Sequence, residues 1–228
     1  MIKAVIFDVD GTLVDSNELH TTAWQRAFKA EGYSFEWQAI REQIGKGGDN
    51  LVANLLGNPE SKADEEEQSR LDKGHGEEYK KLIEQAQPFP AASELIRSLH
   101  ERGVKIALAS SGKQDEIDHY LAKLAVEGCV DVITNSDDVM NSKPDPDIFV
   151  TALKKLSLLA SDALVVGDSP YDIIAARKAG IRCVAVLSGG FERKMLEREQ
   201  PAAIVTDLAA LQRQLDLLVA SDLSRLNG

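Results

Sequence analysis

Short apolar runs rich in β-branched residues alternate with helical patterns along most of this chain, and this alternation restricts its fold more than any other feature. The runs that predict strands lie at residues 2–7, 104–109, 130–134, 163–166, 183–187 and 203–205. The helical patterns that separate the later runs lie at residues 113–124, 146–156, 171–179 and 191–199, and leucines at helical spacing continue to Leu218. Near-continuous apolar strands separated by helices are typical of a parallel sheet with both faces covered. We therefore predict an α/β fold with a doubly wound parallel sheet.

Residues 16–86 interrupt this alternation. The segment has no β-branched run, and its helical patterns lie at residues 18–31, 36–43, 50–56 and 61–85. Pro88 and Pro90 then mark the return to the alternating pattern. We predict an all-helical domain at residues 16–86, inserted between the first strand and its crossover helix, and a core domain made of residues 1–15 and 87–228.

The charge and the cysteine content restrict the class of function. The chain of 228 residues carries a net charge of −11, which disfavours a nucleic-acid surface because phosphate backbones bind clustered lysines and arginines. No apolar run approaches the roughly 20 residues that a bilayer span requires. Cys129 and Cys183 lie in apolar segments without metal or disulfide spacing, and the chain starts with a strand instead of a signal-peptide pattern. We expect a cytoplasmic protein without a membrane or nucleic-acid partner; the sequence leaves the oligomeric state open, and a monomer is compatible with it.

The first predicted strand ends in two aspartates, in the stretch VIFDVDGTLVDS. Because the side chains of a strand alternate between its faces, Asp8 and Asp10 share one face, about 6–7 Å apart along the chain. They lie at the carboxyl end of the strand, the edge at which open α/β sheets bind ligands. We therefore expect both carboxylates to act at a ligand site.

Two further acidic residues, Asp168 and Asp172, follow a later strand in VVGDSPYD. Carboxylates that meet at one sheet edge repel one another strongly unless a divalent cation binds between them. All-oxygen ligation suits a hard ion such as Mg²⁺, so we predict a magnesium site. Asp172 falls near a helix start, and capping that helix is the alternative role for it.

Polar and basic groups follow two of the other strands. Ser110 and Ser111 end the second strand in ALASSGK, directly before a helix whose free N–H groups favour an anion. Lys143 lies in NSKPDPDIF, between the third strand and the next helix, where a surface lysine is the alternative. We predict that these three residues bind the substrate. Together with the aspartates they supply hydroxyls, a cation, a metal site and a nucleophile at the carboxyl ends of the strands.

The motif DVDGT, the serine after the second strand, the lysine of KP and the motif GDSxxD occur in an order that resembles the haloacid dehalogenase superfamily over the whole chain. The helical insert resembles the cap of the branch that contains β-phosphoglucomutase and many sugar-phosphate phosphatases. The resemblance implies a Rossmann-like core with an inserted helical cap domain. It also implies a Mg²⁺-dependent phosphoric monoester hydrolase that acts on a small phosphorylated metabolite through an aspartyl-phosphate intermediate.

The resemblance assigns roles to the residues of these motifs. Asp8 is the expected nucleophile, and Asp10 is the expected general acid and then base, a role that requires a carboxyl pKa raised toward neutrality. Mg²⁺ is expected to bind Asp8, Asp168 and the backbone carbonyl of Asp10, with Asp172 nearby. Ser110 is expected to donate a hydrogen bond to a phosphate oxygen.

Two residues of the helical insert are candidate substrate contacts. Lys46 lies among three glycines in QIGKGGDN, the pattern of a flexible loop, and a solvated turn is the alternative. His20, in DSNELHTTAW, matches a motif of the mutase, and a helix histidine at the hinge is the alternative. Asp49 stands where the mutase uses a cap arginine for a second phosphate, a departure that argues against mutase activity.

Three functions therefore compete. The first is hydrolysis of a small phosphorylated metabolite such as a sugar phosphate, and the second is a sugar phosphomutase of the β-phosphoglucomutase type. The third is a non-catalytic phosphate-binding or receiver-like signalling module, which also uses an acidic cluster and a lysine. A receiver would be much shorter and would lack the helical insert, and Asp10 opposes an inactive enzyme. We predict the phosphatase.

Overall fold

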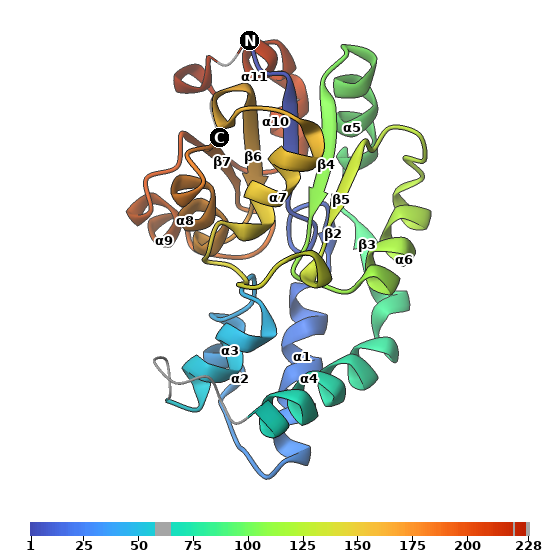
Figure 1. The fold of residues 1–228 in the computed structure, drawn as a ribbon, viewed down its shortest axis with the longest axis vertical. Helices are drawn as coiled ribbons and strands as arrows, with labels where there is room; N and C mark the ends of the chain where they lie inside the picture. The colour runs from blue at the N-terminus through green and yellow to red at the C-terminus, as the bar shows by residue number, and fades with distance from the viewer. Residues whose placement is uncertain (58–64, 221, 227–228) are drawn as a thin grey trace.

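The computed structural model describes residues 1–57, 65–220 and 222–226, so the start of the helix predicted at residues 61–85 lies outside it. Within these ranges the chain forms a six-stranded sheet in the order β5-β4-β1-β6-β7-β8, in which all neighbouring strands are parallel (Figure 1). Its strands are β1 (Ala4–Phe7), β4 (Lys105–Ala109), β5 (Val132–Thr134), β6 (Ala163–Gly167), β7 (Arg182–Val186) and β8 (Ala203–Val205). The predicted parallel sheet is confirmed.

Helices cover both faces of this sheet, because alternate residues of each strand face opposite sides. Val5 and Phe7 of β1 belong to one apolar cluster, to which α5 (Ala92–Glu101), α6 (Gln114–Leu124), α10 (Leu208–Arg213) and α11 (Leu215–Ala220) contribute. Ala4 and Ile6 belong to a second cluster, to which α7 (Asp147–Leu156), α8 (Pro170–Lys178) and α9 (Arg193–Arg198) contribute. The fully buried strand β1 therefore holds its carboxyl end in a fixed place at the centre of the fold.

Two local features were not predicted. The leucine-rich helix at the end of the chain is broken at Gln214, whose φ of −112° is not helical, so two short helices carry the leucines to the core. A two-stranded antiparallel sheet of β2 (Val14–Asp15) and β3 (Gln87–Pro88) joins the two chain segments that lead into and out of the helical insert. Short 3₁₀ helices are η1 (Ile83–Gln85), η2 (Ser136–Asp138), η3 (Ala160–Asp162) and η4 (Leu223–Arg225).

The helices of the insert in its described parts are α1 (Asn17–Ala30), α2 (Trp37–Arg41), α3 (Gly48–Leu55) and α4 (Glu65–Lys80), joined by turns and loops. Its apolar side chains form a cluster of their own, made of Trp24, Phe28, Ile40, Ile44, Leu51, Val52 and Leu71. Figure 1 shows these helices beyond one end of the sheet, the end at which the strand arrows point. The helical insertion is confirmed, and the domain boundaries at residues 16 and 86 remain a prediction.

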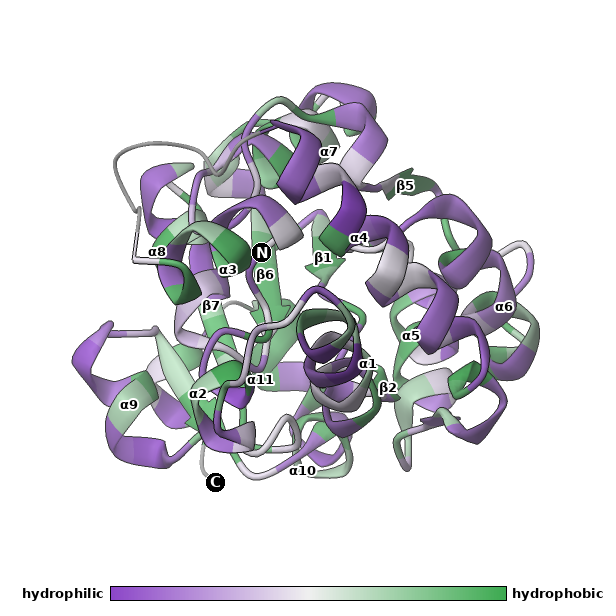
Figure 2. Cartoon of the chain, turned by 90° about the horizontal axis from the view of Figure 1, so that it is seen from below, coloured by the Kyte–Doolittle hydropathy of each residue, from purple (hydrophilic) through white to green (hydrophobic). Residues whose placement is uncertain are grey.

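Hydropathy follows this layering. Figure 2 shows the residues of strands β1, β6 and β7 as hydrophobic and those of α4 as largely hydrophilic, in agreement with the run of glutamates at its start. Among the residues described, none of the helices has both the length and the apolar character that crossing a membrane requires.

Candidate active site

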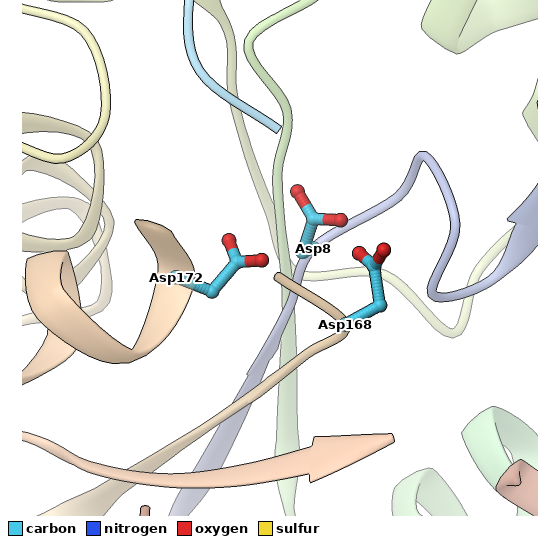
Figure 3. A group of neighbouring side chains, drawn as sticks. All are labelled: Asp8, Asp168 and Asp172. Atoms are coloured by element: carbon cyan, nitrogen blue, oxygen red, sulfur yellow. The ribbon is translucent and has the colours of Figure 1, made fainter. Parts of the chain in front are cut away.

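Three buried carboxylates meet at the carboxyl end of the sheet (Figure 3). Asp8 follows β1, Asp168 follows β6, and Asp172 lies in the first turn of α8. Because β1 and β6 pair in parallel, with Asp8 N–H donating to the carbonyl of Val166 (2.9 Å), the two strands deliver their aspartates to the same point. One oxygen from each of the three carboxylates lies within 4.8 Å of the others, so the predicted meeting of these aspartates is seen.

Asp172 combines the two roles that the sequence left open. Its Oδ2 accepts a hydrogen bond from the backbone N–H of Ser169 (3.1 Å) and its own N–H donates to Ser169 Oγ (3.2 Å), which makes a capping box at the start of α8; Oδ2 also accepts from the Ser169 hydroxyl (2.6 Å). Its Oδ1 lies 2.7 Å from Lys143 Nζ. The helix cap therefore holds this carboxylate in the orientation in which it meets the cluster.

Lys143 is a site residue and not a surface lysine, since only 1% of it is exposed. Its Nζ lies 2.5 Å from Asp8 Oδ1 and donates to the carbonyl of Ala109 (3.3 Å). Burial by itself would lower the pKa of Lys143, but the charges of Asp172 and Asp8 outweigh it and raise the pKa. The side chain is therefore a permanent cation between two buried carboxylates.

The cluster carries more negative charge than Lys143 neutralises. Burial and the charge of Asp172 raise the pKa of Asp8, and the same two causes raise the pKa of Asp168 to about 7. A hard divalent cation removes this repulsion, and three carboxylates are the donor set that such a cation prefers. The space beside the cluster is kept open by glycine: a Cβ on Gly189 would lie 1.6 Å from Asp168 Oδ2, and one on Gly11, where φ is +78°, would lie 2.4 Å from it. The residues present thus fit a Mg²⁺ ion.

Asp10 lies beside the cluster but its side chain is not part of it. Its Oδ1 accepts a hydrogen bond from the Ser16 hydroxyl (2.6 Å) and lies 3.1 Å from His20 Nε2, and its Oδ2 accepts from the Ser110 hydroxyl (3.2 Å). Burial would raise the pKa of Asp10, but the charge and hydrogen bond of His20 outweigh burial and lower it, while Asp10 raises the pKa of His20. The expected raised pKa of Asp10 is therefore wrong for this arrangement, because the neighbouring imidazole of His20 favours the ionised carboxylate.

A cavity of about 350 Å³ lies between the sheet edge and the helical insert. The predicted site residues that line it are Asp8, Asp10, His20, Lys46, Ser111 and Lys143. Ser110, Asp168 and Asp172 are buried next to these residues. Ser110 contacts Asp10, and Asp168 and Asp172 belong to the carboxylate cluster with Asp8. Lys46 Nζ lies 4.6 Å from the centre of the Tyr171 ring and donates to Gln43 Oε1 (2.5 Å), and burial lowers its pKa. The fold therefore brings the core and insert candidates to one cavity.

Sequence reasoning missed several groups that hold the site. The Thr12 hydroxyl lies 3.1 Å from both Asp8 Oδ2 and Asp168 Oδ1, so it bridges the cluster, whereas the sequence indicated only the DVDGT motif to which it belongs. Asn17 Nδ2 donates to Asp168 Oδ2 (3.0 Å) and to the carbonyl of Gly189 (3.0 Å). Nothing in the sequence pattern signals Asn17, because its partners lie more than 150 residues further along the chain.

Comparison with known proteins decides the family. Residues 5–186 match the sequence model of a family described as haloacid dehalogenase-like hydrolase. The chain belongs to the haloacid dehalogenase-like hydrolase family. The resemblance of its motifs is thereby confirmed, as is the prediction that it is an enzyme, a phosphoric monoester hydrolase of this family.

Similar members of the haloacid dehalogenase-like hydrolase family include two named phosphatases. The phosphoglycolate phosphatase of Pseudomonas fluorescens is 31% identical, over 92% of this chain and 78% of the relative. The validoxylamine A 7′-phosphate phosphatase of Streptomyces hygroscopicus is 30% identical, over 82% of this chain and 86% of the relative. Among solved structures, a hydrolase from Pseudomonas syringae superposes with a TM-score of 0.87 at 33% identity, covering 94% of this chain and 98% of that one.

Proposed function

We propose that this member of the haloacid dehalogenase-like hydrolase family is a Mg²⁺-dependent phosphatase that hydrolyses a small phosphorylated metabolite, such as a sugar phosphate, through an aspartyl-phosphate on Asp8. The observation that carries the proposal is the position of Lys143, whose Nζ lies 2.5 Å from Asp8 and 2.7 Å from Asp172. Asp8 thus lines the cavity and contacts the buried ammonium group of Lys143. The two named phosphatases among its relatives act, by their names, on small phosphorylated compounds.

Asp8 is the nucleophile of the proposed reaction. Lys143 and the hydroxyl of Thr12 hold its two oxygens, which fixes the orientation of the carboxylate, and the charge of Lys143 opposes the rise in its pKa. A carboxylate oxygen of Asp8 attacks phosphorus, and the bond between phosphorus and the leaving-group oxygen breaks. Water then attacks the phosphorus of the aspartyl-phosphate, which releases inorganic phosphate and restores Asp8.

The pair of Asp10 and His20 handles the proton of both steps. The pair holds one proton between His20 Nε2 and Asp10 Oδ1, which are 3.1 Å apart. In the first step it gives this proton to the leaving-group oxygen, and in the second it accepts a proton from the attacking water. Ser110, whose hydroxyl donates to Asp10 Oδ2, orients the carboxylate for both transfers.

The cluster of Asp8, Asp168 and Asp172 would hold Mg²⁺, with the backbone carbonyl of Asp10 as a further oxygen ligand. When bound, the cation offsets the charge of the phosphoryl group and of the carboxylates that face it. The hydroxyl of Thr12 and the amide of Asn17 fix the Asp168 carboxylate that would contact it.

A screen of phosphorylated metabolites with the purified enzyme tests this function. We expect release of free phosphate from at least one sugar or polyol phosphate with Mg²⁺, no release in excess EDTA, and recovery on adding Mg²⁺ back. Asp8→Asn should remove essentially all turnover, whereas Asp118→Asn, an exposed aspartate of α6, should leave it unchanged. Full activity in excess chelator, or wild-type turnover of Asp8→Asn, refutes the mechanism, and an isomerised sugar phosphate without free phosphate would assign the enzyme to the mutases.

A further inference from the structure

The imidazole of His20 has a second partner in the helical insert. While its Nε2 faces Asp10, its Nδ1 lies 3.1 Å from Nε2 of His75, which belongs to α4. Asp10, His20 and His75 therefore form a continuous chain of hydrogen-bonding groups that starts at the reaction centre and ends in the insert. His75 lines the cavity together with His20, so it lies within the site and not behind it.

Aromatic rings hold this chain of groups in place. The ring of His20 stacks on Tyr79 with 3.7 Å between the centroids and an angle of 8°. The ring of His75 stacks on Trp24 with 4.3 Å between the centroids and an angle of 13°. Stacking thus fixes the plane of each imidazole, and the hydrogen bond between the two rings fixes how each ring is turned within its plane.

One of the two glycines beside His75, Gly74, allows this arrangement. His75 lies between Gly74 and Gly76 in the middle of α4, where each glycine costs the helix about 1 kcal/mol relative to alanine. A Cβ on Gly74 would lie only 3.3 Å from Cβ of Ala27 in α1, so its absence lets α4 approach α1 closely. This close approach brings the ring of His75 into contact with the rings of Trp24 and His20 on α1.

The position of His20 between Asp10 and His75 gives each of its ring nitrogens one partner. If both nitrogens of His20 are protonated, Nδ1 donates a hydrogen bond to His75 Nε2; if His20 is neutral, Nδ1 can accept a hydrogen bond that His75 Nε2 donates. In both cases the proton on His20 Nε2 points to Asp10.

We propose that His75 is a positioning residue for catalysis: through its hydrogen bond to His20 Nδ1 it holds the proton on His20 Nε2, aimed at Asp10. The inference rests on the proposed phosphatase mechanism, in which the pair of Asp10 and His20 protonates the leaving group. His75 hydrogen-bonds to His20 and stacks on Trp24, so it acts on the reaction centre through His20. It also ties proton transfer to the position of the insert, because α4 supplies the partner that orients the proton donor.

Two variants of His75 separate the hydrogen bond from the stacking. His75→Gln places an amide oxygen and an amide N–H near the position of Nε2, so it keeps a partner for His20 but loses the ring. His75→Phe keeps a ring for Trp24 but has no group for His20 Nδ1. His100→Phe, an exposed histidine at the end of α5, is the matched control.

The readout is kcat/KM for two substrates that differ in their need for a proton. This constant reports the steps up to departure of the leaving group and excludes hydrolysis of the aspartyl-phosphate. For an alkyl phosphate that the screen identifies, His75→Phe should lower kcat/KM by about tenfold, a part of the 10²–10⁴ that general acid catalysis contributes. For p-nitrophenyl phosphate, whose leaving group departs without a proton, the change should stay within about twofold. His75→Gln should recover most of the loss on the alkyl phosphate.

Each result decides between the proposals. Equal losses of His75→Phe on both substrates, or a loss in His75→Gln as large as in His75→Phe, overturn the positioning role and leave His75 as a packing residue. If the wild-type enzyme hydrolyses neither substrate, the proposed function fails first. Should His75→Phe not fold, the ¹⁵N shifts of the wild-type imidazoles decide: a neutral His75 with a hydrogen-bonded Nε2 supports the role, and a freely solvated ring refutes it.

Discussion

Asn50 of α3 is predicted to couple the position of the insert to the reaction centre. Its Nδ2 lies 3.0 Å from the Ser142 hydroxyl, 3.3 Å from the Ser142 carbonyl and 3.1 Å from the carbonyl of Lys143. The neighbouring Asp49 accepts the hydrogen bond that the Ser142 hydroxyl donates. The insert thus hydrogen-bonds to the backbone of Lys143, whose side chain contacts Asp8. These hydrogen bonds form only while the insert lies against the core.

The size of the expected effect follows from these contacts. Asn50→Ala removes two N–H donors, and each partly buried hydrogen bond of this kind contributes about 0.5–1.5 kcal/mol, so about 2 kcal/mol is lost. The loss applies to the state in which the insert covers the site, because water replaces the donors when the insert moves away. If catalysis requires the covered state, kcat/KM should fall by up to about 30-fold.

The assay is kcat/KM on the best phosphorylated metabolite, with the thermal unfolding midpoint as a measure of folding. Asn54→Ala is the control on the same helix, because Asn54 is exposed and its Nδ2 donates to the backbone of Asn50, within α3. Ser142→Ala should cost less when Asn50 is already alanine, since the two residues share one contact. Wild-type kcat/KM in Asn50→Ala would refute the coupling, and an equal fall in Asn54→Ala would assign the loss to the integrity of α3.

Two further predictions concern lysines. Lys46→Ala should lower kcat/KM on a metabolite substrate but barely change hydrolysis of p-nitrophenyl phosphate. The reason is that Lys46 lines the cavity and its contacts are with Tyr171 and Gln43, outside the carboxylate cluster. Equal losses on both substrates would instead assign Lys46 to folding or to the chemical site. Lys155→Met should lower the thermal unfolding midpoint at pH 7, and the free energy of unfolding should fall by less than about 1 kcal/mol because the pair with Asp138 is exposed. The hydrogen bond from Lys155 lowers the pKa of Asp138, so this contribution is present above the ordinary value of 3.8 and is lost as the pH falls through the folded-state value. Unfolding midpoints of both proteins across this pH range test the sign, and a difference that does not shrink in acid contradicts it.

The sequence by itself determined the sheet and the motifs at its edge. Apolar β-branched runs form strands wherever they lie between helices, and parallel strands bring their carboxyl ends to one edge. Asp8, Asp168 and Lys143 directly follow or lie between such elements, so their meeting could be predicted from position alone. The residue pattern of each strand is local, and the rule that parallel strands end at the same edge of the sheet is enough to predict that these residues form one site.

The tertiary structure decided which residues of the insert contact the reaction centre, because the order of residues along the chain does not contain this information. The pKa of Asp10 is lowered because α1 places His20 against it, and a raised value was the expectation from its role alone. His75 reaches His20 across 55 residues of sequence, and Asn50 reaches Ser142 across 92. These contacts depend on how the insert packs on the core, and that packing is set by side-chain shape and helix approach, which the spacing of residue types along a chain does not encode.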